Sequence, residues 1–511
     1  MAVFVIRRLI VSVFILLIST FVVYLLVANS GDPLGDLRLD TSSGRAAKIA
    51  HRIEILDLNT PTPARYVKWL GRAAQCAVPL RGCDLGKSIH DQDVTALLSI
   101  AAVSTLRLVG TATVLALLIG VLIGILSALR QYTPFDYTIT FSTFLMFSLP
   151  IFWIAVLLKQ YLAIAVNDWY ADPKIGLVSA LVLAALSGTI WGAVIGGSSG
   201  RRWAVRGIAG GITFGLLLAL SAQQWFARPA LGPGLITLFS LGAAVAITVL
   251  VSGLNHRSVL YSCLATAAVG CIAQFGLTPM IRSSTYASYT NLLLLAVAAA
   301  LVAAAIGYAL GGLDRPQAIR AAILTALVTG SFIVIDAALR AVPGYSGLVN
   351  GRLFPTVGSN TPNFSGSFWE RLLDTSTHLL LPTLSIMLIS FAGYSRYSRA
   401  TMLEVMNQDY VRTARSKGLT ERTVVMRHAF RNALIPLTTV AAVDFGALIG
   451  GAIITETVFG WKGMGQLFVQ GLLQVDPNPV MGFYIVTAVS IVLFNMLADL
   501  TYAYLDPRIR V

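Results

Sequence analysis

Charged residues are scarce in this chain of 511 residues: they make up 12% of it, whereas hydrophobic residues make up 56%. A soluble domain carries charge on about a quarter of its residues, because charged side chains cover its surface. The mean hydropathy of +0.77 points the same way. The shortage of charge therefore excludes the ordinary soluble classes and indicates a membrane protein.

Acidic residues are the rarer charge type, with 23 Asp and Glu against 37 Lys and Arg and a formal net charge of +14. In a soluble protein this excess would suggest nucleic-acid binding. Here the Lys and Arg residues lie in short loops beside apolar runs, which is the positive-inside pattern of membrane proteins. We therefore expect membrane lipid, and no nucleic acid, as a partner.

Cysteine and histidine are also rare, with 4 and 5 residues. None of the histidines has the spacing of metal ligands, so no metal site is predicted. Cys263 and Cys271 fall in an apolar run and are expected to be buried. Cys76 and Cys83 fall in a polar segment expected outside the cell, where disulfides persist, so we favour a disulfide over two free thiols.

Long apolar runs are abundant, and a helix needs about 20 such residues to cross a bilayer. The first run is too long for a signal peptide and no small-residue cleavage site follows it, so we interpret it as a retained helix. We expect both termini in the cytoplasm and twelve crossings, at 9–28, 100–128, 137–166, 175–197, 207–227, 233–254, 259–277, 291–313, 319–339, 376–395, 434–455 and 481–505.

These crossings predict an all-α polytopic membrane protein in three parts. Residues 1–169 hold three crossings and a long external loop, 29–95. Residues 170–340 hold six more, and residues 341–511 hold the last three with a cytosolic segment, 396–432. Because six is an even number, the middle block leaves the orientation of the flanking parts unchanged.

The cytosolic segment is the most charged stretch of the chain, and we expect it to form two short helices. The first is expected over 398–417 and ends at Gly418, which suits the position after a helix where a positive φ is needed. The second is capped by Thr420 and carries Glu421 in its first turn. Pro436 is expected to mark the start of the next membrane helix.

The sequence DYVRTARSKGLTERTVVMRHAFRNALIPL, at 409–437, resembles the EAA loop of ABC importer permeases. Ala414, Gly418 and the Ile435-Pro436 pair match the motif. Arg412 stands where the motif has its leading Glu, and the stretch from Gly418 to Pro436 is longer than in sugar-type permeases. Both departures are typical of the dipeptide/oligopeptide subfamily, so the resemblance is to that subfamily.

Further motifs of the same family follow in the same order along the chain: NSGDPL (29–34), CDLGKSI (83–89), ETVFGWKGMGQLFVQGL (456–472) and YLDPRIR (504–510). The resemblance covers 1–166 and 344–511 and leaves the middle block unexplained. The stretch GCDLGKS is one residue too short between its glycines for a phosphate-binding loop and is expected outside the cell, so we predict no nucleotide site there.

The resemblance implies a type I permease core of six helices, to which about six more have been added. It implies a transport subunit of a bacterial inner-membrane peptide importer, not an enzyme. The implied partners are a second homologous permease subunit, an extracytoplasmic substrate-binding protein and two ATPase subunits. ATP and Mg would be bound by the ATPases, and this chain would bind no cofactor.

The same resemblance implies that the cytosolic segment couples the permease to an ATPase. The alternative is a charged loop that only fixes the membrane topology. The helix break at Gly418 and the motif around it favour the coupling role. The residues expected to carry it are Arg412, Ala414, Arg415, Lys417, Gly418, Thr420 and Glu421.

Several alternatives remain open at this stage. The same machine would also suit nickel chelates or another solute, and a secondary transporter or membrane enzyme that acts alone is the alternative of a different class. Asp336 lies in an expected crossing, where a carboxylate is costly, and an ion pair with Arg340 is favoured over a functional role. The middle block is expected beside the core and outside the translocation path, although a gate or docking platform is the competing hypothesis.

Overall fold

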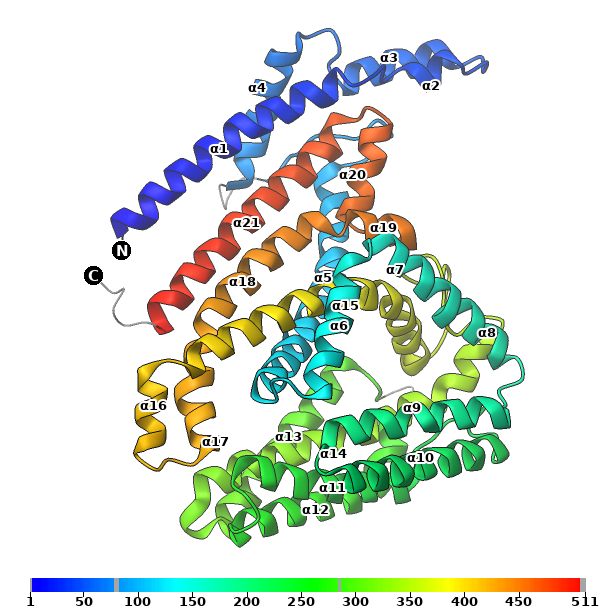
Figure 1. Ribbon diagram of the computed structural model, residues 1–511. Helices are drawn as coiled ribbons and strands as arrows, with labels where there is room; N and C mark the ends of the chain where they lie inside the picture. The colour runs from blue at the N-terminus through cyan, green and yellow to red at the C-terminus, as the bar shows by residue number, and fades with distance from the viewer. Residues whose placement is uncertain (1, 78–81, 284–285, 506–511) are drawn as a thin grey trace. The chain divides into compact units, whose positions relative to one another are not determined.

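The computed structural model describes residues 2–77, 82–283 and 286–505 (Figure 1). Within these ranges the chain is almost entirely helical and forms no strand, with one isolated bridge between Lys87 and Asp93. Eleven helical segments of the described part are long and apolar enough to cross a membrane. The predicted all-α polytopic class is therefore confirmed.

The chain divides into two compact units. The first unit comprises Met1–Gln160, Thr356–Ser359 and Leu379–Val511, and the second comprises Tyr161–Pro355 and Asn360–His378. The helices of the first unit are α1 (Ala2–Ala28), α2 (Gly35–Arg38), α3 (Arg45–Ile55), α4 (Thr62–Ala73), η1 (Ala74–Ala77), α5 (Val94–Leu129), α6 (Pro134–Ser148), α7 (Ile151–Leu158), α16 (Asp409–Ser416), α17 (Glu421–Thr423), η4 (Val424–Ala429), α18 (Phe430–Gly451), α19 (Ile453–Phe459), α20 (Met464–Leu473) and α21 (Pro477–Leu505).

Two helical segments pass from one unit to the other along the chain. They are η2 (Lys159–Ile164) and α15 (Phe368–Met406). The remaining helices belong to the second unit: α8 (Ala165–Tyr170), α9 (Leu177–Ile195), α10 (Ser199–Ala222), α11 (Gly232–Val251), α12 (Arg257–Arg282), α13 (Tyr289–Leu310), η3 (Gly312–Asp314) and α14 (Arg315–Leu348).

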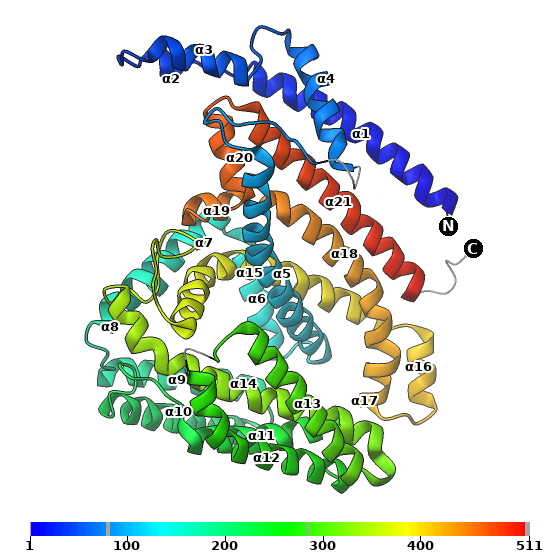
Figure 2. The same ribbon diagram turned by 180° about the vertical axis from the view of Figure 1, so that it is seen from behind.

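In the first unit, α1 lies along α21 and is also held by α4, which belongs to the expected external loop (Figure 2). The contact between α1 and α4 is aromatic: Tyr24 and Tyr66 meet edge to face, and Trp69 stacks on Tyr66. The Thr20 hydroxyl and the Tyr66 hydroxyl are 2.9 Å apart and share a buried hydrogen bond. Beyond this cluster, Cys76 and Cys83 form a disulfide.

The second unit contains the six helices expected over 170–340, and each starts and ends within about ten residues of its expected run. α9 packs on α10 closely enough that a Cβ on Gly188 would lie 2.5 Å from the Arg206 carbonyl. α11, α12 and α14 share a core of small side chains that includes Cys263. Cys263 and Cys271 are buried and unbonded, as expected.

The chain enters and leaves this six-helix block at neighbouring points. The Asn167 side-chain amide donates to the Phe354 carbonyl at 2.8 Å, and the Phe354 N–H donates back to Asn167 Oδ1 at 3.0 Å. The two residues are 187 positions apart in the sequence. A block whose ends meet in this way has the geometry of an insertion.

The expected single crossing at 137–166 is wrong, because the structure breaks it into α6 and α7. Leu149 and Pro150 are extended, with ψ of 131° and 143°. Proline lacks the N–H that a helix interior needs, and it disfavours helical backbone at the residue before it. Hydropathy alone predicts one helix here, because a hydropathy average over the run does not show the helix-breaking effect of Pro150 in its middle.

Candidate functional site

The charged segment between α15 and α18 folds into a helical hairpin (Figure 1). Figures 1 and 2 both show α16 beside α17, at the opposite end of α18 from α19. The expected first helix over 398–417 is wrong: α15 continues to Met406, and α16 starts only at Asp409. At about 1.5 Å per residue, α15 is about 58 Å long and extends well beyond a bilayer core of about 30 Å.

Gly418 forms the turn of this hairpin. Its φ is +73°, as expected for the residue that follows a helix. The Gly418 N–H donates to the Arg415 carbonyl at 2.9 Å, and the Leu419 N–H donates to the Ala414 carbonyl at 3.4 Å. This is the Schellman pattern, which satisfies the last carbonyls of a helix and fixes the direction in which the chain leaves it.

Two contacts support the hairpin beside Gly418. The Arg415 guanidinium donates to the Glu421 carboxylate at 2.7 and 3.3 Å, and this hydrogen bond lowers the pKa of Glu421. The Thr420 hydroxyl accepts the Thr423 N–H at 3.4 Å and so caps α17 as expected. Because the ion pair is exposed, it adds only a small stabilisation to this arrangement of α16 and α17.

Beneath the hairpin, Val411, Ala414 and Val424 form a small buried cluster that packs against Val405 and Met406. A larger residue at Ala414 would push α16 off this cluster. Of the residues expected to couple to an ATPase, Ala414 is therefore the buried anchor, and the other six are exposed. The structure brings all seven onto one projecting turn.

The hairpin joins α18 through η4, a stretch of π-helix, and not at Pro436 as expected. α18 starts at Phe430, and Pro436 lies inside it. The expectation is wrong because helical backbone runs without a break from α17 through η4 into α18, with Pro436 in its interior. The charged hairpin and the membrane helix are thereby mechanically continuous.

A second anchor near this end of the unit ties α15 to the first turn of α6. The Arg399 guanidinium donates to both oxygens of Asp136, at 2.8 and 2.9 Å. The Ser127 hydroxyl and the Tyr132 N–H also donate to this carboxylate. Nothing in the spacing of these residues, which are up to 272 positions apart by their numbers, indicated the contact in the sequence.

At the other end of the unit, the motif ETVFGWKGMG is organised around one buried carboxylate. Glu456 is fully buried, and burial raises its pKa. It accepts the Thr105 hydroxyl at 2.6 Å and the N–H groups of Gly465 and Gln466 at 2.7 and 3.1 Å. It therefore caps the first turn of α20, where a negative charge is favourable.

The glycines of this motif leave room for that carboxylate. A Cβ on Gly463 would lie 2.3 Å from Glu456 Oε1, and a Cβ on Gly465 would lie 2.9 Å from Glu456 Oε2. The spacing of Glu and Gly in the sequence is thus the spacing of a cap and the helix start that it covers. Sequence reasoning found the motif but not its physical cause.

Lys159 is a charge within a membrane-crossing segment, Ile151–Tyr170, and sequence reasoning missed it. Its ammonium group donates to the Val458 carbonyl at 2.5 Å and lies 5.1 Å from the centre of the Phe459 ring. A cation is expensive inside a bilayer, and here it holds the C-terminal end of α19, where carbonyl dipoles favour it.

The motif CDLGKSI docks onto the turn between α20 and α21. The Asp476 carboxylate accepts the Ile89 N–H at 2.7 Å, and the Asn478 side-chain amide donates to the Lys87 carbonyl at 2.7 Å. Burial raises the pKa of Asp476 to about 6. The motif CDLGKSI and the turn that follows α20, far apart in the sequence, are therefore in contact.

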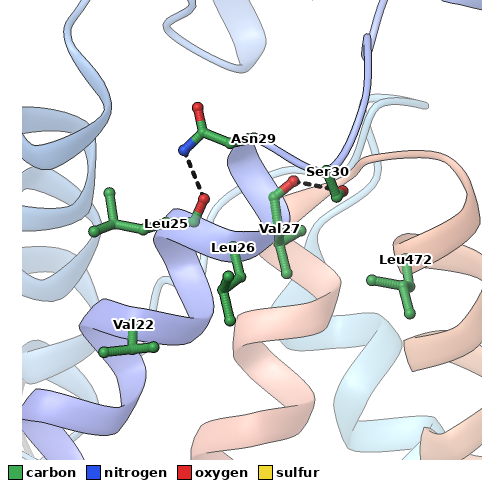
Figure 3. Close-up of a pocket in the computed structure, with 7 residues that line it drawn as sticks. All are labelled: Val22, Leu25, Leu26, Val27, Asn29, Ser30 and Leu472. Carbon is green, nitrogen blue, oxygen red and sulfur yellow. Dashed lines mark hydrogen bonds between the residues drawn. The ribbon is translucent and has the colours of Figure 1, made fainter.

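An apolar hollow of about 650 Å³ lies beside α1, near the motif NSGDPL (Figure 3). Val22, Leu26 and Leu472 line it. The two polar side chains at its edge, Asn29 and Ser30, donate to the carbonyls of Leu25 and Val27 and are already satisfied. The hollow offers apolar contact and no chemistry, and the described residues hold no cluster of three or more potential metal ligands elsewhere either.

A family profile described as "binding-protein-dependent transport system inner membrane component" matches residues 211–511, which is more than half of the chain. The chain belongs to this family. It is a multi-pass membrane protein of a transport system, and the family is the one whose motifs the sequence carries.

Curated relatives within this family are named as peptide permeases. The chain is similar to the oligopeptide transport system permease protein OppB of Mycobacterium tuberculosis, with 40% identity over 188 residues, 37% of this chain and 58% of the relative. It is also similar to the oligopeptide transport system permease protein AppB of Bacillus subtilis, with 41% identity over 161 residues, 32% of this chain and 50% of the relative.

A third relative is the dipeptide transport system permease protein DppB of Escherichia coli K12, with 43% identity over 138 residues, 27% of this chain and 41% of the relative. The chain thus spans about half the length of the curated relatives that it matches.

Proposed function

We propose that this chain is the transmembrane permease subunit of an ATP-driven, binding-protein-dependent importer of di- or oligopeptides. It forms half of the translocation path, and a second homologous permease subunit forms the other half. Family membership supports the transport role. The names of the relatives, which are dipeptide and oligopeptide permeases, support the substrate class.

The observation that carries this proposal is the hairpin of α16 and α17. A coupling element needs a rigid body that makes different contacts in two states of the machine. The Schellman turn at Gly418, the Arg415–Glu421 pair and the buried Ala414 make the hairpin rigid. Its continuity with α18 gives any movement of the hairpin a direct route into the membrane helices.

The exposed residues of the hairpin form the proposed contact with the ATPase. Arg412, Lys417 and Glu421 offer charge, and Leu419 adds an apolar side chain that is 41% exposed. Two ATPase subunits would bind ATP and Mg and hydrolyse the nucleotide, so this chain is a transport subunit without a cofactor of its own. Its role is to receive the movement that hydrolysis drives.

The proposed orientation follows from this contact. The hairpin and both termini face the cytoplasm of a bacterium, and the chain lies in the inner membrane. The external loop 29–95 and the segment around α19 and α20 face outward, where an extracytoplasmic substrate-binding protein would dock. The contact between Asp476 and Ile89 ties these two outward segments together.

The test is reconstitution of the chain with the permease, ATPase and binding-protein subunits encoded beside it. ATP hydrolysis in proteoliposomes is measured with the binding protein alone and with the binding protein carrying peptides, nickel chelates or oligosaccharides. We expect peptides to stimulate hydrolysis and to be taken up. Stimulation by another solute would correct the substrate class, and uptake by this chain without ATPase subunits would overturn the importer proposal.

A further inference from the structure

The second unit holds an apolar groove that the transport proposal does not use. It has a volume of about 660 Å³ and lies between α12, α13 and α14. Small residues leave the space open, among them Gly270, Ala299, Ala303 and Gly330. The groove reaches the surface, because side chains at its edge, such as Val302, are half exposed.

The groove has the length of a lipid chain. Along α12 its lining runs from Thr266 to Ile281. Fifteen steps of about 1.5 Å each correspond to about 22 Å, which exceeds half the thickness of a bilayer core of about 30 Å. A channel of this length and composition matches one extended acyl chain.

A charged cluster lies at one end of the groove. The lining residues Ile281 and Ile335 are followed directly by Arg282 and Asp336. Asp336 Oδ2 accepts Arg282 Nη2 at 2.7 Å and Arg340 Nε at 2.9 Å. The expected pair of Asp336 with Arg340 is therefore confirmed, and Arg282 is a second partner that the sequence did not reveal.

This cluster carries an excess of positive charge. The other oxygen of Asp336 accepts the N–H groups of Leu231 and Gly232, each at 2.9 Å, so both carboxylate oxygens are occupied. One carboxylate faces two guanidinium groups, each of which has five N–H donors. The side chains of Arg282 and Arg340 remain 38% exposed, whereas that of Asp336 is 4% exposed.

We infer that this groove binds an anionic glycerophospholipid, with one acyl chain between α12, α13 and α14 and its phosphate on Arg282 and Arg340. The apolar channel alone would accept any lipid chain, and the cluster alone would accept any small anion. Their direct continuity selects a molecule that has both parts. Arginine suits the site because its planar fork binds phosphate oxygens in pairs.

The test measures lipid retention by the full-length chain, purified in mild detergent and observed by native mass spectrometry. Phosphatidylglycerol and phosphatidylcholine with the same acyl chains are offered at equal concentration. We expect phosphatidylglycerol to be retained at least fivefold more than phosphatidylcholine. Equal retention of the two lipids would overturn the charge part of the inference.

Two variants separate the acyl-chain groove from the headgroup site. Gly330→Leu fills the groove, since nothing lies within 4 Å of an added Cβ there, and should lower retention of both lipids at least fivefold. Arg340→Gln leaves Arg282 paired with Asp336 and should remove most of the preference for phosphatidylglycerol. Unchanged retention in Gly330→Leu would show that the lipid binds elsewhere and would overturn the inference.

A matched control and a second ligand complete the test. Gly276→Leu lies on the exposed side of α12, outside the groove, and also has nothing within 4 Å of its added Cβ, so its lipid retention should equal that of the native chain. Inorganic phosphate alone should not raise the melting temperature. A rise equal to that produced by phosphatidylglycerol would mean that the cluster binds anions without the groove, against the inference.

Discussion

The two units of this protein use polar residues in opposite ways. In the first unit, buried carboxylates and cations from distant parts of the chain fasten helix ends and loops, as Glu456, Asp476 and Asp136 do. In the second unit, α11, α12 and α14 share a cluster made mostly of Ala side chains, and polar contacts gather at the ends, as at Asp336. Small side chains thus stand out in the packing of the second unit, and long-range hydrogen bonds stand out in the first.

This difference fits the coupling role proposed for the first unit. Small residues let helices approach closely and associate within lipid, but they define no second arrangement of those helices. Helix ends held by a few strong polar contacts give rigid bodies with discrete hinges, which a coupled machine requires. The difference therefore predicts that the first unit is sensitive to single polar substitutions and that the second unit tolerates large changes.

The strongest test of the first unit is Glu456→Ala. The substitution leaves the Thr105 hydroxyl and two backbone N–H groups buried without an acceptor, which should cost about 4 kcal/mol. We expect little folded protein, seen as aggregation in size-exclusion chromatography of the detergent-purified chain. Thr457→Ala, on the exposed side of the same helix, is the control and should be harmless. A stable Glu456→Ala protein would mean that the cap of α20 does not hold this unit together.

The next largest effect is expected for Gly418→Val. Valine in the left-handed region costs about 1–2 kcal/mol or more, and 1.4 kcal/mol corresponds to tenfold in an equilibrium. We expect peptide-stimulated ATP hydrolysis of the reconstituted complex to fall about tenfold while membrane insertion persists. Gly418→Asn is the control, since Asn tolerates a positive φ and should retain most of the stimulation. If valine leaves stimulation intact, the hairpin is not the coupling element.

A smaller, pH-dependent effect is expected at Asp476. Its pKa is about 6 in the folded protein, whereas the ordinary pKa of an Asp side chain is 3.8, so the folded state favours the protonated form. This contribution to stability is fully present below about pH 4 and is lost as the pH rises through about 6. The melting temperature of the native chain should therefore fall by a few degrees over that range, relative to Asp476→Asn measured in parallel. Parallel curves for the two proteins would contradict the assignment.

The sequence predicted the second unit more completely than the first. Six uninterrupted apolar runs, separated by short loops, define six helices with little ambiguity, and the structure has them. In the first unit, hydropathy failed wherever a backbone feature interrupted a run or extended it. Pro150 interrupts the helix expected over 137–166. At η4, helical structure begins before the expected start of the next membrane helix.

For the proposed coupling hairpin, the turn was predictable from the sequence, but the long-range contacts that support its unit were not. Gly418, Thr420 and Glu421 act locally, within a few residues, and local rules place them correctly. The contacts of Glu456 with Thr105 and of Lys159 with Val458 join residues about 300 or more positions apart in the sequence. No rule of spacing along one chain reports such pairs, although a lone lysine in an apolar run was a visible signal.

The smallest effect on transport is expected from the largest change, which is removal of the six-helix block. Asn167 and Phe354 hold the two ends of the block together by paired hydrogen bonds, so residues 172–350 can be replaced by a short Gly/Ser linker without moving the flanks. Six crossings are removed, an even number, and the orientation of the remaining helices is kept.

If the block lies beside the translocation path, as the packing of small residues suggests, peptide uptake by the shortened protein should stay within about twofold of native after correction for expression. Asn167→Ala in the full-length chain measures what the paired hydrogen bonds contribute while the block is present. The contrary outcome is a shortened protein that inserts and assembles with its partners but neither stimulates ATP hydrolysis nor transports. That outcome would place the block within the transport mechanism. The two units would then differ in packing but not in function.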